Sequence, residues 1–463
     1  MSALVVSRSS LSTSLTRYSR SWGLWLLLLI APVGARFMVP RGDGTAIVIS
    51  INDQLPVMTS AVLGVCLGVV VSTLFLPAAY IYLRSNTNRR QPWQVEEVSG
   101  APRVAMMLGR FAADVAMLLA MLVALNLAGW FLAWLVVPPA ELNLLQISFA
   151  LWVIAAPALI GLAAIHTLFD ALSFTRGALG DLFYLVLWIT SIAMPSNADG
   201  MAPSFRANMY DFGGFARPLI YGSRVPDPSF AIGGGPTVPG RIAIDAMAGL
   251  LSPGYLESRG MWALIAVAVV VLAGLVYRPH RVRQRGTRFA RLAKRLARGA
   301  PRPADPQAPA ARASAHPWLA LTLAEARLIG PSRLFVILAV AVALAGLAPD
   351  YRHVGSPAAL LLLIFGLTAH AGRSEARGLR ALTRLAALGP LSRRLAFIAA
   401  GLAWSILLAL PAALAQASAA PLALAATIGG AAAVTAIGLA TLSGSAFAPR
   451  IVLLIAWYVY SLT

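Results

Sequence analysis

The sequence is poor in the residues that build catalytic, metal and disulfide sites. Its one cysteine, Cys66, cannot form a disulfide within the chain and argues against a cysteine metal site. The five histidines are scattered without metal-ligand spacing. The 17 acidic residues are dispersed, which disfavours a membrane-embedded enzyme that needs clustered acid–base groups at one interface. No G-x-x-x-x-G-K-[ST] sequence occurs, and the glycine-rich segment Gly233–Gly240 contains no lysine, so the chain has no P-loop for ATP.

Apolar residues are abundant. They make up 59 % of the chain, whereas charged residues make up 12 %, and the mean hydropathy is +0.76. Soluble domains are closer to ~45–50 % apolar and ~25 % charged. The net charge of +20 would suggest nucleic acid as the partner of a soluble protein. Here the arginines cluster beside apolar spans, so the positive-inside bias explains the charge and no nucleic-acid partner is expected.

Hydropathy and arginine placement predict an all-α polytopic membrane protein with about eleven transmembrane helices, in a range of ten to twelve because several spans are short. The N-terminus is predicted to be cytoplasmic. As an alternative, the first apolar stretch behind Arg17 and Arg20 could be a signal peptide. The predicted spans are Trp22–Met38, Val57–Tyr82, Ala105–Val137, Ile147–Leu168, Leu182–Met194, Met261–Tyr277, Phe335–Leu347, Ala358–Thr368, Leu395–Ala417, Leu422–Leu442 and Ile451–Leu462.

The spans fall into two pseudo-symmetric halves. Residues 1–278 hold six spans and a large outer loop at 195–260, and residues 317–463 hold about five. A basic and then Pro/Ala-rich cytoplasmic linker, 279–316, joins them. Each half is preceded by a short amphipathic stretch, Ser9–Ser21 or Pro317–Arg327, that suits an interfacial, elbow-type helix. The second half has no counterpart of the outer loop and the sixth span.

A polar cytoplasmic element occurs twice, each time between two apolar spans: Arg84–Arg110 and Arg373–Arg394. Both copies begin with Arg-Ser, carry acid in the middle and reach a small-Pro step followed by arginine. These shared residues are Glu96, Glu97, Ala101, Pro102 and Arg103 in the first copy, and Glu375, Gly389, Pro390, Arg393 and Arg394 in the second. Duplicated elements of this kind are typical of pseudo-symmetric transporters.

The order of surface helix, paired spans and Glu-bearing element ending in Pro-x(x)-Arg resembles the ABC-2 type permeases, the membrane subunits of ATP-driven exporters. The resemblance implies that each element is a coupling helix, matched here by Trp93–Pro102 with Arg103 and by Arg377–Pro390 with Arg393. The implied coupling residues are Trp93, Glu96, Glu97, Pro102, Arg103, Glu375, Arg377, Pro390 and Arg393. It further implies two cytoplasmic ATP-binding subunits that carry ATP and Mg, no cofactor in this chain, and a bacterial-type inner membrane. The alternative is that both elements are ordinary positive-inside loops.

Few charges are predicted inside spans. Arg110 and Asp114 stand four residues apart and predict an intrahelical pair near the inner rim, as do His166 and Asp170. No chain of mid-membrane carboxylates supports an ion-coupled secondary carrier, which is the main alternative to an exporter. A membrane-embedded enzyme or an assembly factor is the remaining alternative. Leu-, Ala- and Val-rich spans favour an amphipathic cargo such as a peptide, a lipid-linked molecule or an antibiotic.

Two further features leave alternatives open. The aromatic-rich outer loop 195–260 is either a cap over an exit path, with an envelope partner, or an amphipathic strip on the outer leaflet. Gly64 and Gly68 have the spacing of a G-x-x-x-G helix contact, and the second span could face Gly366 of the eighth across a central path. Either one chain or two copies would then form the pore.

Overall fold

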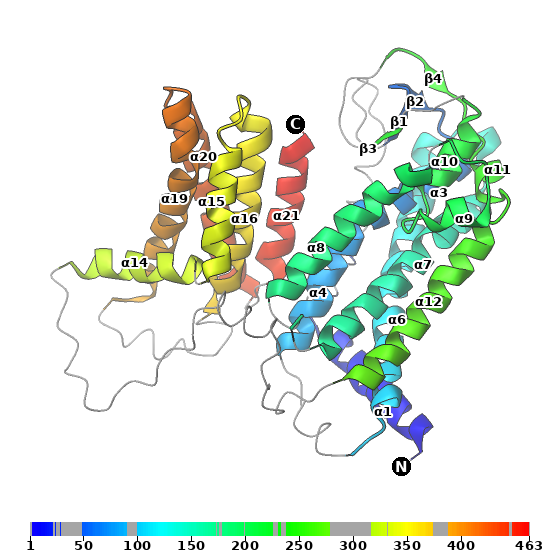
Figure 1. Ribbon diagram of the computed structural model, residues 1–463, viewed down its shortest axis with the longest axis horizontal. Coiled ribbons are helices and arrows are strands. Elements are labelled where there is room, and N and C mark those ends of the chain that lie inside the picture. The colour runs from blue at the N-terminus through cyan, green and yellow to red at the C-terminus, as the bar shows by residue number, and fades with distance from the viewer. Residues whose placement is uncertain are drawn as a thin grey trace. The chain divides into compact units, whose positions relative to one another are not determined.

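The protein is a helical membrane protein, drawn in Figure 1 from a computed structural model. The structure describes residues 2–21, 24, 28, 49–89, 100–172, 174–175, 178–198, 200–225, 230–232, 238–277, 316–330, 332–373, 388–443 and 447–462. Within these ranges, seven helices are long and apolar enough to cross a membrane, or up to eight if one bent pair is a single span. The predicted all-α polytopic class is therefore confirmed in outline, whereas the count of eleven is not.

The chain divides into two compact units, Met1–Arg283 (unit 1) and Gln284–Thr463 (unit 2). In unit 1 the long helices are α3 to α4, α6, α7 and α12, and a shorter helix, α8, follows α7. The first predicted span, Trp22–Met38, lies almost wholly outside the described residues. The bounds of the unit 1 helices are α1 (Ala3–Ser19), α3 (Ser60–Val70), η1 (Val71–Phe75), α4 (Leu76–Arg89), α6 (Arg103–Val136), η2 (Pro139–Glu141), α7 (Leu144–Ala171), α8 (Ala178–Ala193), η3 (Met194–Ala198) and α12 (Tyr255–Val276).

The second predicted span contains a wide helical turn, the π-helix η1 (Val71–Phe75), just before Pro77. Proline has no backbone N–H, so it breaks the hydrogen-bond ladder of an α-helix. The Ser72 carbonyl instead accepts a hydrogen bond from Nε1 of Trp188 on α8, at 2.9 Å. The π turn and Trp188 together keep the helix continuous across the proline and fix α8 against it.

Glycines let α3 approach α7 closely. A Cβ atom on Gly64 would lie 2.6 Å from the Ile147 carbonyl oxygen, and one on Gly68 would lie 2.6 Å from Cγ2 of Ile154. The close contact expected from the G-x-x-x-G spacing thus exists, but its partner is α7 of the same unit. Gly366 is likewise covered within unit 2, by the Ile329 carbonyl and the Phe335 ring. These glycine faces are therefore occupied inside their own units.

We expect Gly64→Ala to destabilise the protein by about 1–3 kcal/mol, because overpacking a buried helix contact forces backbone shifts. The matched control is Gly260→Ala in α12, where a Cβ would meet nothing within 4 Å. That change should be neutral or stabilise by about 0.5–1 kcal/mol, since alanine is the better helix former. Thermal unfolding midpoints of the two variants in detergent test the difference, and equal midpoints would contradict the packing.

Unit 2 is built on one amphipathic helix and several spans. Helix α14 (Pro317–Ile329) meets α15 (Arg333–Ala345) at a bend of 88°, so α14 lies across the ends of the spans (Figure 1). Ser332 begins α15 by accepting a hydrogen bond from the Phe335 N–H at 3.1 Å. The remaining helices are η4 (Tyr351–Gly355), α16 (Ser356–His370), α19 (Pro390–Ala415), α20 (Ala420–Ser443) and α21 (Phe447–Leu462).

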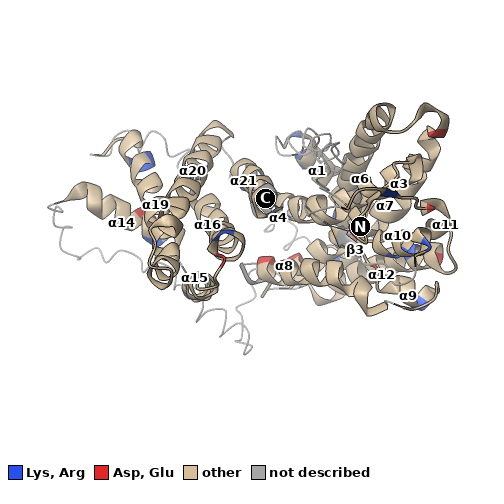
Figure 2. Cartoon of the chain, turned by 90° about the horizontal axis from the view of Figure 1, so that it is seen from above, with Lys and Arg blue, Asp and Glu red and all other residues tan. Residues whose placement is uncertain are grey.

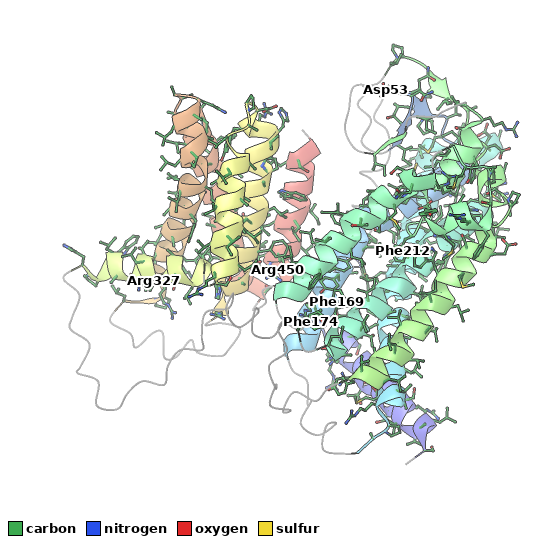
Figure 3. All side chains as sticks on the ribbon, in the orientation of Figure 1. Asp53, Phe169, Phe174, Phe212, Arg327 and Arg450 are labelled. Carbon is green, nitrogen blue, oxygen red and sulfur yellow. The ribbon has the colours of Figure 1, made fainter. Side chains whose placement is uncertain are left out.

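Small residues and interhelical hydrogen bonds hold these spans together. A Cβ on Gly401 of α19 would lie 2.8 Å from Cβ of Ala433 on α20, which is the close approach that small residues permit in membranes. On α21, Trp457 Nε1 donates to the Pro357 carbonyl at 2.7 Å. Arg450, labelled in Figure 3, donates from Nε to Thr368 Oγ1 at 2.8 Å. Charged residues, coloured blue and red on the cartoon of Figure 2, are sparse along the helices.

The segment 195–260 of unit 1 is folded wherever the structure describes it. It contains helices α9 (Phe205–Met209), α10 (Ala216–Ser223) and α11 (Ala246–Leu250). Two small sheets, absent from the prediction, join it to the segment before the second span. In these sheets β1 (Ile49–Ile51) pairs antiparallel with β3 (Phe230–Ile232), and β2 (Leu55–Pro56) pairs parallel with β4 (Arg241–Ile242). Two loops assigned to the same side of the membrane thus meet through backbone pairing.

Candidate functional site

The predicted coupling residues are only partly within the described part of the chain. Trp93, Glu96, Glu97, Glu375 and Arg377 lie outside it. The other four mark the beginning of long helices: Pro102 and Arg103 start α6, while Pro390 and Arg393 lie in the first turn of α19. Proline suits the start of a helix because its missing N–H would have no partner there. Each duplicated element therefore leads directly into a span of its own unit.

In unit 1 helix α1 packs along the beginning of α6 (Figure 1). Ser10 Oγ donates to the Met106 carbonyl at 3.1 Å. A Cβ on Gly109 would lie 2.3 Å from the Ser7 carbonyl oxygen, so only glycine allows this approach. A movement of α6 that keeps this packing must therefore carry α1 with it.

A buried polar cluster joins α1, α6 and α7. Asp114 on α6 accepts a hydrogen bond from the Tyr18 hydroxyl, and its Oδ2 lies 2.9 Å from Nδ1 of His166 on α7. Arg110 Nη1 lies 3.5 Å from Asp170 Oδ2. All five residues are less than 10 % exposed. The cluster thus brings one guanidinium, one imidazole and two carboxylates together between the three helices.

The pairing in this cluster differs from the spacing-based prediction. Arg110 with Asp114, and His166 with Asp170, were expected to pair along one helix. The structure gives each of them a partner on another helix. Residues four apart lie on the same face of a helix. The two faces of α6 and α7 that carry these residues pack against each other, so each side chain meets a partner on the other helix.

Tyr18 was missed because it is far from Asp114 in sequence. Its side chain is 2 % exposed, and burial, followed by the nearby Asp114 carboxylate, raises the pKa of Tyr18 well above its ordinary value. The hydroxyl therefore stays protonated and acts as a donor. An isolated tyrosine at the end of an amphipathic stretch was the available sequence signal.

Arg103, a predicted coupling residue, has an internal partner. Its Nη1 donates to the Tyr277 carbonyl at the end of α12, at 3.2 Å. A cation at this position also interacts favourably with the helix C-terminus. Arg103 therefore ties the start of α6 to the last turn of α12, which leads into the linker between the units.

In unit 2 helix α14 packs on α19. Glu325 Oε1 lies 3.7 Å from Nε of Arg393, another predicted coupling residue. Trp404 Nε1 donates to the Ala326 carbonyl at 2.9 Å. The Glu325 side chain is 10 % exposed, whereas that of Arg393 is 41 % exposed. An internal ion pair therefore holds the partly exposed Arg393 side chain against α14.

The first copy of the duplicated element begins with an arginine that forms an ion pair with α8. Arg84, near the end of α4, contacts Asp181 of α8 with its Nε, at 3.2 Å from Oδ1. Its Nη2 donates to the Thr175 carbonyl at 2.5 Å. One turn earlier, the Tyr80 ring stacks on Tyr184 of α8, with ring centroids 3.7 Å apart. The start of this element is therefore fixed to α8.

The segment 195–260 of unit 1 is organised by a buried carboxylate. Asp211 is fully buried and accepts backbone N–H bonds from Gly214 and Arg217, both at 2.8 Å. Gly214 has a φ of +79°, which the turn requires and which favours glycine. Burial raises the pKa of Asp211, although the Arg259 guanidinium opposes the shift.

Arg259 of α12 secures the same turn from the membrane side. It is 3 % exposed and donates to the carbonyls of Phe212 at 3.1 Å and Asn208 at 3.3 Å, and to that of Asp211. Phe212, labelled in Figure 3, packs edge-on against Trp262 with ring centroids 5.0 Å apart. The segment is thus a packed cap on the ends of the helices, as far as the structure describes it.

No metal-binding group of three His, Cys, Asp or Glu side chains exists among the described residues. Comparison of the chain with family models, curated proteins and solved structures gave no match. The arrangement of the chain's own residues is therefore the basis for any functional proposal.

Proposed function

We propose that the chain is the membrane subunit of an ATP-driven exporter of the ABC-2 type, which moves an amphipathic substrate outward. The observation that carries the proposal is the repeated pair of a surface helix and a span. In both units the helix packs on the span that follows the duplicated polar element, α1 on α6 and α14 on α19. This geometry gives each element a direct mechanical link into the membrane.

The contacts between α1 and α6, and between α14 and α19, support the transmission of a displacement from each element to its span. In unit 1 Tyr18 and Asp114 link the surface helix to the span, and in unit 2 Glu325 and Arg393 do so. Rigid helices joined by packing and polar contacts move as bodies rather than deform. A soluble subunit that presses on either element would therefore displace a surface helix together with a span.

The remaining parts of the proposal follow from the sequence. The chain has no P-loop, so two separate cytoplasmic subunits bind and hydrolyse ATP. The positive-inside bias orients the protein with its N-terminus in the cytoplasm of a bacterial-type inner membrane. The described spans are dominated by aliphatic side chains, which suits an amphipathic cargo better than an ion. The outer cap is the surface available to an envelope partner.

Reversing the charge of one element tests the coupling role. The variant Glu96→Arg/Glu97→Arg should abolish substrate-stimulated ATP hydrolysis by the assembled transporter, because repulsion replaces attraction at the contact with the ATP-binding subunit. Stability should change by less than about 0.5 kcal/mol if these side chains face water or that subunit. ATPase assays in proteoliposomes, with co-purification of the subunit, give the readout.

The matched control is Glu141→Arg/Glu257→Arg, which makes the same charge change at two exposed positions in η2 and the first turn of α12. It should retain stimulated hydrolysis. Transport by the Glu96→Arg/Glu97→Arg variant at the unaltered rate would refute the coupling role. Purification of the wild-type chain in mild detergent without any ATPase subunit would count against the whole proposal.

A further inference from the structure

Helix α12 carries a continuous apolar stripe on its exposed side. The stripe takes every third to fifth residue, while the opposite side of the helix, with Arg259 and Val270, is buried in unit 1. A stripe of this kind on a helix that is long enough to cross a membrane faces the acyl chains. Its members are between 37 % and 69 % exposed and are Leu256, Met261, Leu264, Val267, Leu272 and Leu275.

The stripe continues into the cap, the described part of segment 195–260. Phe205 at the start of α9 is 41 % exposed, and Leu251 at the end of α11 is 58 % exposed. A Cβ on Gly254 would lie 2.5 Å from Cα of Phe205, and α9 and α12 are in contact (Figure 1). We call Phe205, Leu251 and Leu256 the cap rim. It extends the apolar stripe beyond the first turn of α12.

The length of α12 places the cap rim at the edge of the hydrocarbon. The helix has 22 residues, so it is about 33 Å long at 1.5 Å per residue, and a hydrocarbon core is about 30 Å thick. Arg278 follows the helix closely, and a charged side chain is costly inside hydrocarbon. That end of α12 therefore lies at one edge, and its first turn reaches the opposite edge. Tilt of the helix would draw the first turn further in.

Charged neighbours of the cap rim fit this depth. Arg206 follows Phe205, Glu257 follows Leu256, and both are exposed. From the edge of the hydrocarbon both side chains can reach the headgroups and water, whereas at its centre each would be costly. Exposed apolar patches mark contacts with a protein or with a membrane. Because the cap rim is continuous with the lipid-facing stripe of α12, the membrane is the partner that fits.

We propose that the cap rim is inserted into the leaflet at the cap end of the spans, among the acyl carbons that lie next to the headgroups. The folded cap thus stands partly in lipid on its α12 side, and the cap rim fixes its depth. The proposal does not depend on the transport activity, because it concerns the chain and the bilayer alone.

Spin-label accessibility tests the depth of the cap rim. Nitroxide labels are attached to Phe205→Cys and to Leu251→Cys, one at a time, in the full-length chain reconstituted into vesicles of phosphatidylcholine and phosphatidylglycerol. Oxygen concentrates in hydrocarbon and a hydrophilic nickel chelate stays in water, so power saturation with each reagent reports the surroundings of the label. Both labels should collide more often with oxygen than with the chelate. Native Cys66 is 1 % exposed, and the labelled wild type measures its background.

Two further positions calibrate the measurement. Leu264→Cys, in the middle of the stripe, should be accessible to oxygen and protected from the chelate. Arg241→Cys should show the reverse order, because Arg241 is an exposed residue of β4, beyond α9 at the end of unit 1 (Figure 1). All four side chains are exposed, so cysteine should be tolerated at each position, and either position of the cap rim is sufficient for the test.

The alternative occupants of the cap rim give different results. Labels that resemble the one at Arg241→Cys would show that the cap rim faces water, which would overturn the proposal. Labels protected from both reagents would also overturn it, because a second copy of the chain would then cover the cap rim.

Discussion

Replacing Arg259 by alanine should unfold the cap of unit 1, which is the described part of segment 195–260. The guanidinium is buried and donates to the carbonyls of Asn208, Asp211 and Phe212. Alanine would leave these carbonyls and the fully buried Asp211 carboxylate without their cation. Removing one partner of a buried charged network costs about 3–5 kcal/mol, and Arg259→Ala should lower the stability of the cap by that amount.

Two measurements test whether Arg259→Ala destabilises the cap. Limited proteolysis of the purified protein should cut the cap of Arg259→Ala at protease concentrations that leave the wild type intact, and the thermal unfolding midpoint should fall. Arg224→Ala is the matched control, since the Arg224 side chain is 75 % exposed and pairs with a half-exposed Asp245 at 3.1 Å. Surface pairs contribute about 0–1 kcal/mol. Equal protease sensitivity in the two variants would show that Arg259 does not organise the cap.

Three polar side chains in the described part of segment 195–260 are buried. Asn208, Asp211 and Arg217 are at most 1 % exposed. The Asp211 N–H donates to the Asn208 carbonyl, and the Arg217 N–H donates to the Asp211 carboxylate. The described residues therefore form a folded cap. Its role in substrate exit or in binding an envelope partner belongs to the proposed function.

Most of the helices could be predicted from the sequence because long apolar runs have few other structures in a bilayer. The predicted span Ala105–Val137 corresponds to α6 (Arg103–Val136) within two residues. Errors arose where polar residues enter a helix. The prediction Ala358–Thr368 fell short because the helix begins with the π turn at Tyr351, and Arg352 and His353 lower the local hydropathy.

The candidate site was less predictable because its contacts join distant segments. Spacing indicates which residues share a helix face, but it cannot say which helix covers that face. Asp114 forms hydrogen bonds with Tyr18, 96 residues earlier, and with His166, 52 residues later. Glu325 lies in a stretch predicted correctly as a helix, and its pairing with Arg393 depends on the crossing of α14 and α19. The strands β1 and β3 were missed because three-residue strands have no alternation to detect, and because their pairing joins distant segments.

In double-mutant cycles on the α1–α6–α7 cluster, the cross-helix pairs should show the largest coupling energies. Arg110→Met alone should cost about 3–5 kcal/mol, because it removes the guanidinium that pairs with the buried Asp170 carboxylate across the helices. Asp170→Leu alone should cost a similar amount. Arg110→Met/Asp170→Leu should recover most of that loss, since it removes both charges and fills the space with apolar atoms.

The comparison cycle distinguishes this pairing from the one predicted by spacing. Arg110→Met/Asp114→Leu removes two residues on the same face of α6, but it leaves Asp170 without Arg110, and His166 and Tyr18 without Asp114. This double variant should therefore recover little of the stability lost in the single variants, whereas His166→Phe/Asp114→Leu should recover more. Interaction energies of contacting residues are about 0.5–3 kcal/mol, which unfolding midpoints in detergent can resolve. Stronger coupling of Arg110 to Asp114 than to Asp170 would mean that the ion pairs form along the helices, and that α6 and α7 are held together by apolar packing alone.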